Sequence, residues 1–353
     1  MSDIFSILES IKDKDKLILP SNPNDVVLII DGLNSFIRCF CCVPTLNDNG
    51  IHIGGLTGFL QSVGKAIRQF RPTRCVVVFD GVGGSQRRRK LYPDYKANRK
   101  NRDNVRLNRT YDFQNIQEER ESQKNQLIKS VQYLDLLPVT IMSMDRIEAD
   151  DVIAYLAVQK LNKNNNQSVI IMSSDKDFVQ LVDDRVHIWN PIRKLLLTPE
   201  NVKDVYKIPA HNYLTYRILD GDSSDNIKGV KGIGIKTLQK RIPEIFTDER
   251  VTVDTLLEHA EEHQKEAKIF RDLLENKDTL ELNYKLMQLE DVNISGTSKL
   301  KIVELFDAPI SIMNTLKFQQ MFMTDKLWAA FPNVSSWLKT SFSTLDSFAR
   351  KTQ

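Results

Sequence analysis

The sequence predicts an α/β fold in which a mostly parallel central sheet is flanked by helices. Short apolar runs rich in β-branched residues, such as VVLIID at 26–31 and SVIIMS at 168–173, alternate with longer stretches of mixed polarity that suit helices. Three of the apolar runs stop at acidic residues. In an open parallel sheet, residues at this position lie at the carboxyl ends of the strands, where ligand sites form.

The expected elements follow this alternation along the chain. Residues 1–24 are polar and end in Pro and Asn, so they are expected to form an extension before the core. A helix is expected directly after the first strand, and after residue 198 the pattern becomes helical. The expected strands are 26–31, 75–80, 138–142, 168–173 and 185–189, and the helices between them lie around 55–70, 120–136 and 149–162. The expected division is an extension over 1–24, an α/β core over 25–198, a helical region over 199–298 and a helical tail over 299–353.

The bulk composition is that of an ordinary globular protein, 41% hydrophobic and 27% charged. No apolar stretch reaches the length of a membrane span, and the first residues lack the pattern of a secretory signal, so the cytoplasm is the expected location. Four cysteines give no disulfide framework, and no paired histidines or second CxxC suggests a metal site for them. The residues Cys39, Cys41, Cys42 and Cys75 are expected to be buried as small apolar side chains.

The net charge of +3 hides a strongly basic segment. Residues 86–109 hold ten Lys or Arg and two Asp, a local balance of +8 that leaves −5 for the rest of the chain. Such a block indicates a polyanionic partner, although a solvated loop or a localisation signal is the alternative. Tyr92 and Tyr95 favour nucleic acid, because aromatic faces stack on unpaired bases. Since residues 84–115 contain few large apolar groups, we expect them to be mobile or partly unstructured without a ligand.

Acidic residues recur where an active site would need them. They follow apolar runs in VVLIIDG, CVVVFDG and SVIIMSSDKD, and they also stand in IEADDVIAYLA and GDSSDN. Carboxylates gathered on one rim repel each other unless a hard cation neutralises them, and oxygen ligands suit Mg²⁺ or Mn²⁺. Taken singly, acids in a first helical turn can serve only the helix dipole, and GDSSDN is a common turn composition. The residues concerned are Asp31, Asp80, Glu148, Asp150, Asp151, Asp175, Asp177, Asp222 and Asp225.

A glycine-rich turn follows, in GVKGIGIK at 229–236. Exposed backbone N–H groups at such a turn before a helix can hold a phosphate, and Lys231 and Lys236 flank it.

These motifs, in this order, resemble the 5′-nuclease superfamily. The superfamily includes the 5′→3′ exonuclease domain of bacterial DNA polymerase I, phage 5′-exonucleases with flap and RNase H activity, and cellular flap endonucleases. The resemblance covers about residues 26–240, and the long helical tail looks closest to the phage replication nucleases. The chain departs from relatives in its longer lead, VGGSQRRRKLYP, and in Leu238, where a small Ala is common. The matching strings are IIDGLNSFIRCF, VVVFDG, YPDYKANR, IEADDVIAYLA, MSSDKDFVQLV and GDSSDNIKGVKGIGIKT.

The resemblance implies a PIN-like nuclease core with a basic helical arch at about 84–120 and a helix-hairpin-helix element at about 210–242. It implies hydrolysis of phosphodiester bonds near the 5′ end of DNA or RNA–DNA hybrids at duplex–single-strand junctions, with exonuclease, flap and RNase H-type primer removal in DNA replication. It also implies two or more Mg²⁺, with Mn²⁺ as a substitute, and it allows K⁺ at the hairpin.

The resemblance likewise implies roles for individual residues. Asp31, Asp80, Glu148, Asp150 and Asp151 are assigned mainly to a first metal, and Asp175, Asp177, Asp222 and Asp225 mainly to a second. Lys96 and Arg99 are expected near the scissile phosphate. The residues expected to contact DNA are Arg87, Arg88, Arg89, Lys90, Tyr95, Lys100, Gly229, Lys231, Gly232, Gly234 and Lys236.

Other interpretations remain open at this point. A PIN-type ribonuclease or a metal-dependent phosphatase uses a similar rim of carboxylates, and a DNA-binding scaffold without activity is a different class. The many aromatics of residues 300–353 predict either a small helical bundle with its own core or a docking surface for a single-strand-binding protein. The expected oligomeric state is a monomer. A phage-encoded chain would act in the host cytoplasm.

Overall fold

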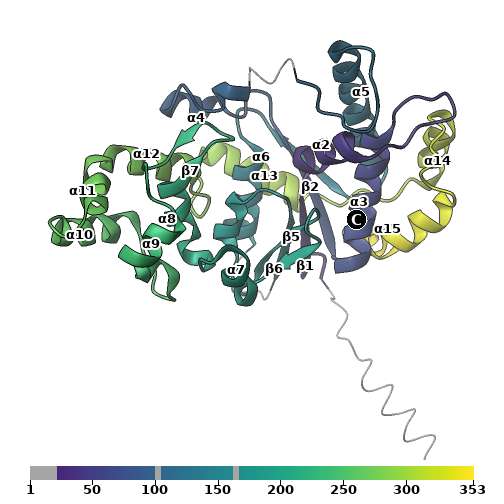
Figure 1. Cartoon of the computed structure of the whole chain (residues 1–353). Helices are drawn as coiled ribbons and strands as arrows, with labels where there is room; N and C mark the ends of the chain where they lie inside the picture. Colours follow the sequence, from purple (N-terminus) through teal and green to yellow (C-terminus); the bar gives the residue numbers. More distant parts are fainter. Residues whose placement is uncertain (1–21, 100–104, 162–166) are drawn as a thin grey trace, which may run out of the picture.

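The computed structural model describes residues 22–99, 105–161 and 167–353, so most of the expected extension and Lys100 lie outside the described residues. The core is a six-stranded sheet in the order β3-β2-β1-β4-β5-β6 (Figure 1). The first five strands are parallel, and β6 is antiparallel to β5. The predicted fold class is confirmed. The strands are β1 (Val26–Asp31), β2 (Arg74–Asp80), β3 (Thr140–Met144), β4 (Ser168–Met172), β5 (Val186–Asn190) and β6 (Leu195–Leu197).

Helices cover both faces of this sheet (Figure 1). Because side chains alternate along a strand, Leu28 and Ile30 of β1 pack into one apolar cluster, and Val27 and Ile29 pack into the other. The first face is covered by α2 (Gly32–Cys42), α3 (Gly54–Phe70), α5 (Ile116–Leu134), α14 (Thr315–Thr324) and α15 (Val334–Lys351). The second is covered by α6 (Ala149–Ala154) with the π-helical turn Tyr155–Lys160, the 3₁₀ turn Asp177–Leu181, α7 (Pro199–Tyr206) and α13 (Gly296–Asp307).

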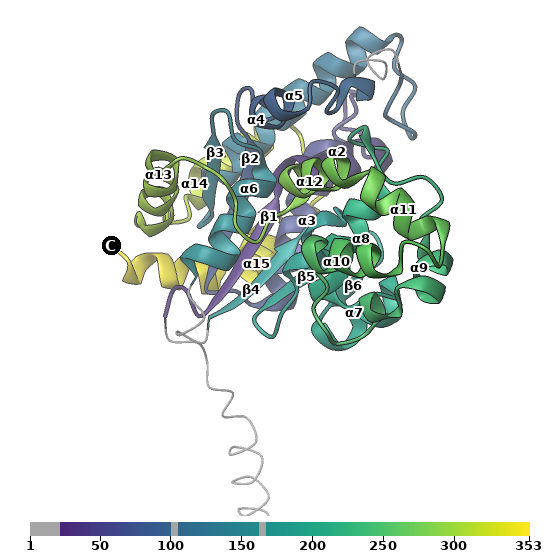
Figure 2. The same ribbon diagram turned by 90° about the vertical axis from the view of Figure 1, so that its left-hand side faces the viewer.

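A third apolar cluster lies beside the sheet and is built by the helices that follow α7, together with Tyr95 (Figure 2). The hairpin that follows α8 begins at Gly221, which has a φ of +76°. A Cβ atom at this position would meet the backbone nitrogen of Gly229 at 2.3 Å. Only glycine fits such a conformation easily. The elements are α8 (Ala210–Asp220), β7 (Gly221–Asp222), β8 (Ile227–Lys228), α9 (Ile235–Arg241), the 3₁₀ turn Pro243–Phe246, α10 (Val253–His263), α11 (Lys268–Glu275) and α12 (Lys277–Met287).

The C-terminal tail does not form the separate bundle that its aromatics predicted. Most of its aromatic side chains are buried against the sheet and not in a core of their own, and the other expectation, a docking surface for a single-strand-binding protein, stays a prediction. Phe306 is buried with the second face of the sheet, and Phe318 and Phe342 are buried with the first. Polar contacts fix the tail as well, since Lys129 and the hydroxyl of Tyr133 bind Asp325 at 3.0 and 2.9 Å. The tail is thus part of the α/β core, because a sheet with two apolar faces needs helices on both.

Two further differences concern short segments. Strand β6 was not predicted, because three consecutive leucines show no alternation. Of the cysteines expected to be buried, Cys39 and Cys75 are buried, but Cys42 is exposed and Cys41 is half-buried. In the last turn of α2, Cys39 and Phe40 thus face the core, whereas Cys42 faces outward. Across the described residues, no helix is long and apolar enough to span a membrane.

Candidate active site

The site begins where β1 passes directly into α2. Asp31 is the last residue of the strand and also the N-cap of the helix, so its carboxylate accepts a hydrogen bond from the backbone nitrogen of Asn34 at 3.1 Å. The hydroxyl of Ser173, just beyond β4, donates to the same carboxylate at 2.9 Å. These two bonds fix a buried carboxylate at the carboxyl end of the central strand.

The neighbouring strand supplies a second carboxylate. Asp80 ends β2 and accepts a hydrogen bond from the backbone nitrogen of Ala149, the first residue of α6, at 2.7 Å. The chain then turns at Gly81, where a Cβ atom would lie 1.7 Å from the backbone oxygen of Met144. The β2 end and the start of α6 are thereby held together, and Asp150 follows at once on α6.

The carboxyl ends of the strands surround a cavity of about 370 Å³. Five of the nine predicted acids line it, and they come from β1, β2, α6, the loop after β4 and the turn between β7 and β8. Cations face them from the segment before residue 100 and from α2. The charged lining residues are Asp31, Asp80, Asp150, Asp175, Asp225, Lys96, Arg99 and Arg38.

The gathered carboxylates are electrostatically costly. Burial raises the pKa of Asp31 to about 7, and the charges of Asp175 and Asp80 act in the same direction against the hydrogen bonds from Asn34 and Ser173. Burial is also the main cause that raises the pKa of Asp150, followed by the charges of Asp175 and Asp31. The pKa of Asp175 is raised as well, again mainly by burial. A cation in the cavity would relieve this penalty.

Two of the predicted metal acids are engaged by an arginine. Arg88 of α4 (Gln86–Leu91) is only 4% exposed, and its guanidinium binds Glu148 at 2.5 Å and both oxygens of Asp151 at 2.8 and 2.9 Å. It also donates to the backbone oxygen of Leu286 at the end of α12, at 2.8 Å. Burial favours a higher pKa for Glu148, but the charges of Arg88 and then Lys96 outweigh it and lower this pKa. Glu148 and Asp151 do not line the cavity.

A second arginine engages the remaining two predicted metal-binding acids, Asp177 and Asp222. Arg217 of α8 donates to Asp177 at 3.1 Å and to Asp222 at 2.5 Å, and it is largely buried. Ser224 also donates to Asp222 through its backbone nitrogen and hydroxyl, at 2.6 and 2.7 Å. Although burial opposes it, these bonds from Ser224 and the charge of Arg217 lower the pKa of Asp222. Burial raises the pKa of Asp177 to about 7.

The described part of the basic segment is bound to acids at the cavity, and its expected mobility without DNA stays a prediction. The hydroxyl of Tyr95 donates to Asp225 at 3.1 Å, and Arg99 binds the same carboxylate at 2.5 Å. Lys96, in a left-handed conformation with φ of 57°, binds Glu148 and lies 3.8 Å from Asp225. Its side chain is 12% exposed, whereas that of Arg99 is 52% exposed. Lys96 and Arg99, which were predicted to lie near the scissile phosphate, therefore neutralise acids of the site.

Most of the described residues predicted to contact DNA are exposed or half-buried, and two are buried. Arg89 and Lys90 are exposed on α4, and Arg87 is half-buried against Asp151. Lys231, Gly232, Gly234 and Lys236 are exposed at the glycine turn, and Gly229 is half-buried under the hairpin. Arg88 and Tyr95 are buried instead, because each is bound to carboxylates of the site. Arg88 was expected to contact DNA, whereas in the described structure its guanidinium binds Glu148 and Asp151.

Sequence reasoning missed three residues of the site. Asn34 and Arg38 line the cavity from α2, and Arg217 joins two acids. Asn34 and Arg38 lie three and seven residues after Asp31, which is the helical spacing that keeps residues on one face. That spacing was a usable signal. Nothing in the local sequence marks Arg217.

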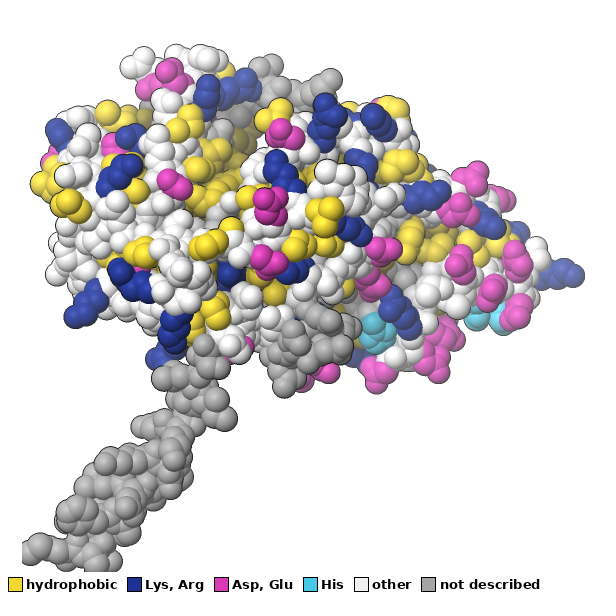
Figure 3. Space-filling view, turned by 180° about the vertical axis from the view of Figure 1, so that it is seen from behind, with side chains coloured by type: hydrophobic (Ala, Val, Ile, Leu, Met, Phe, Trp, Pro, Cys, Tyr) yellow, Lys and Arg dark blue, Asp and Glu magenta, His cyan; other side chains and the backbone are white. Residues whose placement is uncertain are grey.

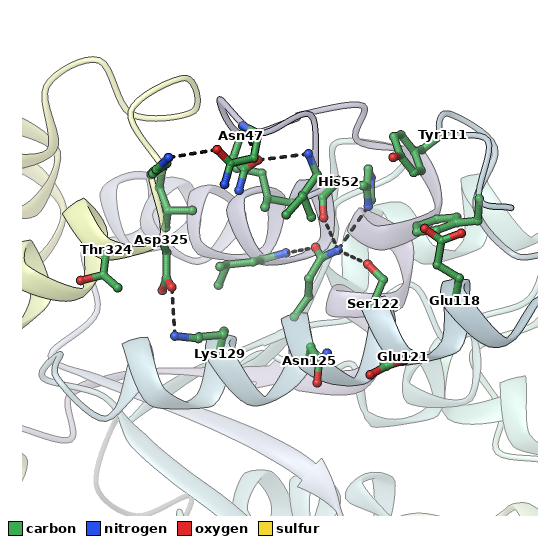
Figure 4. A pocket seen from close by; sticks show the side chains of 18 residues that line it. Asn47, His52, Tyr111, Glu118, Glu121, Ser122, Asn125, Lys129, Thr324 and Asp325 are labelled. Atoms are coloured by element: carbon green, nitrogen blue, oxygen red, sulfur yellow. Dashed lines mark hydrogen bonds and ion pairs between the residues drawn. The ribbon is translucent and has the colours of Figure 1, made fainter.

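Another cavity, of about 490 Å³, lies elsewhere in the structure (Figure 4). It lies between the loop before α3, α5 and the end of α14, and no predicted site residue lines it. The side chain of Gln126 donates to the backbone oxygen of His52 and to Ser122, and its oxygen accepts from the backbone nitrogen of Leu56. These bonds tie α5 to the loop before α3, while Lys129 and Asn49 at the same cavity bind Asp325 and Lys326 of the tail.

Comparison with known proteins places the chain in a family. The model of the 5′-3′ exonuclease N-terminal resolvase-like domain matches residues 26–207, and that of the 5′-3′ exonuclease C-terminal SAM fold matches residues 208–305. The chain belongs to the 5′-3′ exonuclease family. The predicted resemblance is confirmed.

Individual relatives agree with this assignment. The chain is 31% identical over 263 residues to the 5′-3′ exonuclease of Aquifex aeolicus, covering 74% of this chain and 80% of that protein. It is 30% identical over 290 residues to DNA polymerase I of Caldicellulosiruptor bescii, covering 79% of this chain. The chain spans only 32% of that polymerase. A structure of the bacteriophage T5 5′-exonuclease with bound zinc has a TM-score of 0.61 and 18% identity, covering 86% of this chain and 99% of that one, and it shows the shared fold.

Proposed function

We propose that the chain is a divalent-metal-dependent 5′-nuclease that hydrolyses phosphodiester bonds near the 5′ end of DNA. The observation that carries this proposal is the acidic cavity, in which five carboxylates from separate elements face Lys96, Arg99 and Arg38. Membership of the 5′-3′ exonuclease family supports hydrolysis, and the T5 flap endonuclease with the same fold is described in complex with DNA and metal ions. The proposed activities are 5′→3′ exonuclease, flap cleavage and RNase H-type primer removal in replication.

The residues of the cavity fit a hard divalent cation. Within the described ranges, no three His, Cys, Asp or Glu side chains already stand close enough to hold an ion. The cavity nevertheless gathers five carboxylates, of which Asp31 is buried, and oxygen ligands of this kind suit Mg²⁺ or Mn²⁺. When bound, such ions lower the pKa of a water molecule and stabilise the leaving oxygen. We propose Asp31, Asp80, Asp150 and Asp175 as ligands, with Asp225 at the edge.

The four remaining acids reach an ion only if their ion pairs open. Glu148 and Asp151 would have to leave Arg88, and Asp177 and Asp222 would have to leave Arg217. We therefore propose that these four orient the cavity or join a second ion after rearrangement. The K⁺ allowed at the hairpin rests on the resemblance alone.

The cations of the chain have a separate task. Without DNA, Lys96 and Arg99 bind Glu148 and Asp225. A phosphate entering the cavity would replace these carboxylates as their partner, so that both side chains offset the negative charge developing on it. Arg38, whose Nε has no hydrogen-bond partner among the described residues, is placed to join them from α2.

Duplex binding would occur at the glycine turn. Lys231 and Lys236 are exposed there, and a Cβ atom at Gly232 or Gly234 would meet nothing within 4 Å. A phosphate backbone can therefore approach the main chain closely. Binding of both the junction and the adjoining duplex would select long DNA over small phosphate esters.

The proposal is tested by gel analysis of 5′-labelled flap, nicked duplex and RNA–DNA substrates, with Mg²⁺ and with EDTA. We expect cleavage near the 5′ end that needs the metal and is lost in Asp175→Asn. Asp145→Asn is the matched control, since Asp145 is exposed beyond β3 and does not line the cavity. Hydrolysis of small esters without DNA cleavage would indicate a phosphatase, and binding without cleavage would indicate a scaffold. Light scattering of the same sample tests the expected monomer.

A further inference from the structure

The last turns of α10 place two histidine rings side by side. His259 and His263 are four residues apart, and residues at this spacing lie on one helical face. Their ring centroids are 4.2 Å apart, with an interplanar angle of 22°. Both residues are half-buried, and both rings contact Phe270 of α11, at centroid distances of 5.4 and 5.7 Å. Phe270 therefore holds the two rings in place, and both rings remain partly exposed to solvent.

The hydrogen bonding of His263 leaves one ring nitrogen available. Its Nδ1 lies 2.9 Å from the backbone oxygen of His259. A carbonyl oxygen only accepts, so Nδ1 carries the proton, and Nε2 of the neutral ring keeps a free lone pair. Histidines that bind metals show this division, in which one ring N–H donates to a carbonyl or carboxylate and the other nitrogen binds the ion.

The surroundings of the pair attract cations. Residues 254–266 hold five acidic residues and one lysine. Figure 3 shows the same feature, with His side chains among Asp and Glu at the end of the molecule formed by α10 and α11. Glu262 lies three residues after His259, on the same face of the helix, and offers a carboxylate. In Figure 1 this end is far from α2, so the pair is separate from the acidic cavity.

We propose that His259 and His263 form a binding site for a transition-metal ion of the Zn²⁺ class. Two histidines four residues apart on a helix are a known arrangement for Zn²⁺, and imidazole suits Zn²⁺, Ni²⁺ and Cu²⁺ far better than Mg²⁺. Because the rings are already adjacent, an ion that binds one nitrogen of each requires rotation about side-chain bonds only. Water completes the coordination. Since Phe270 holds the rings against α11, the ion stabilises the junction of α10 and α11 and has no part in hydrolysis.

Calorimetric titration of the full-length protein with Zn²⁺, in a large excess of Mg²⁺, tests the site. The Mg²⁺ competes for carboxylate sites and leaves the imidazoles free. We expect one Zn²⁺ whose affinity falls by about tenfold or more in His259→Ala and in His263→Ala, as the loss of a coordinating group requires. His187→Ala is the control, because His187 is also half-buried but lies in β5. Equal Zn²⁺ affinity in all four proteins would overturn the proposal.

A second measurement does not depend on the variants folding well. In the wild-type protein, Ni²⁺ should broaden the ring-proton NMR signals of two of the five histidines before the others. The two signals are identified as those missing in His259→Gln and His263→Gln. Broadening of all five together, or of His187 and His211 first, would show adventitious binding and refute the site. Because nuclease activity is not the readout, failure of the proposed function would leave both results unchanged.

Discussion

Replacing Arg88 by Met should destabilise the protein strongly, although sequence reasoning placed this residue on a DNA-binding surface. The guanidinium is buried and forms ion pairs with Glu148 and Asp151, which are buried as well. It also donates a hydrogen bond to the backbone oxygen of Leu286. Methionine fills a similar volume but leaves two carboxylates without this partner. Breaking a buried ion pair from one side costs about 3–5 kcal/mol, which is a large part of the stability of a typical domain.

Urea unfolding, followed by circular dichroism, measures this cost. We expect a lower midpoint for Arg88→Met with little change in the slope against urea, since the same surface is exposed on unfolding. Arg89→Met is the matched control, because Arg89 is adjacent and exposed, and it should shift the unfolding free energy by less than about 0.5 kcal/mol. If Arg88→Met has wild-type stability and only weakens DNA binding in a salt-dependent way, then Arg88 faces DNA and its burial as described here is wrong.

Four further results are expected. Asp175→Asn should abolish cleavage by removing a ligand from the cavity while DNA binding, measured by fluorescence anisotropy, stays the same or tightens. Lys96→Ala should lower the single-turnover cleavage rate by more than it lowers affinity, since its ammonium acts mainly on the transition state; an equal loss in both would argue for simple binding. Lys231→Ala combined with Lys236→Ala should reduce the slope of log affinity against log salt by about one per lost phosphate contact, and an unchanged slope would exclude such contacts. Deleting 300–353 should give an insoluble or unfolded protein, and a soluble truncated protein with normal flap cleavage would contradict the role of the tail in the core.

The sequence was informative where a function depends on local pattern. Asp31 and Asp80 could be placed at neighbouring strand ends because each directly follows an apolar β-branched run, and parallel strands bring such ends together. The glycine turn at 229–236 could be placed for a similar reason, since its glycines directly precede a stretch that forms helix α9. These predictions need only the short-range rules for strands and turns.

The parts that could not be predicted depend on contacts between distant segments. Arg88 stands in a run of four basic residues, and nothing in that run shows which of them turns inward. Its burial is decided by α6 and by the end of α12, some 60 and 198 positions away. The position of Arg217 between Asp177 and Asp222 has the same origin. The tail was misread because its aromatics give only a helical period, which is the same for a separate bundle and for a cover on the sheet.

The central claim is that the carboxylates at the strand ends hold the divalent cations that carry hydrolysis. Its most direct test is anomalous diffraction from crystals of the protein grown with Mn²⁺. We expect a peak inside the cavity, within coordination distance of Asp31, Asp80, Asp150 or Asp175 (about 2.0–2.3 Å). Crystals that diffract well and show Mn²⁺ only outside the cavity, or no Mn²⁺ under conditions that support cleavage, would contradict the claim.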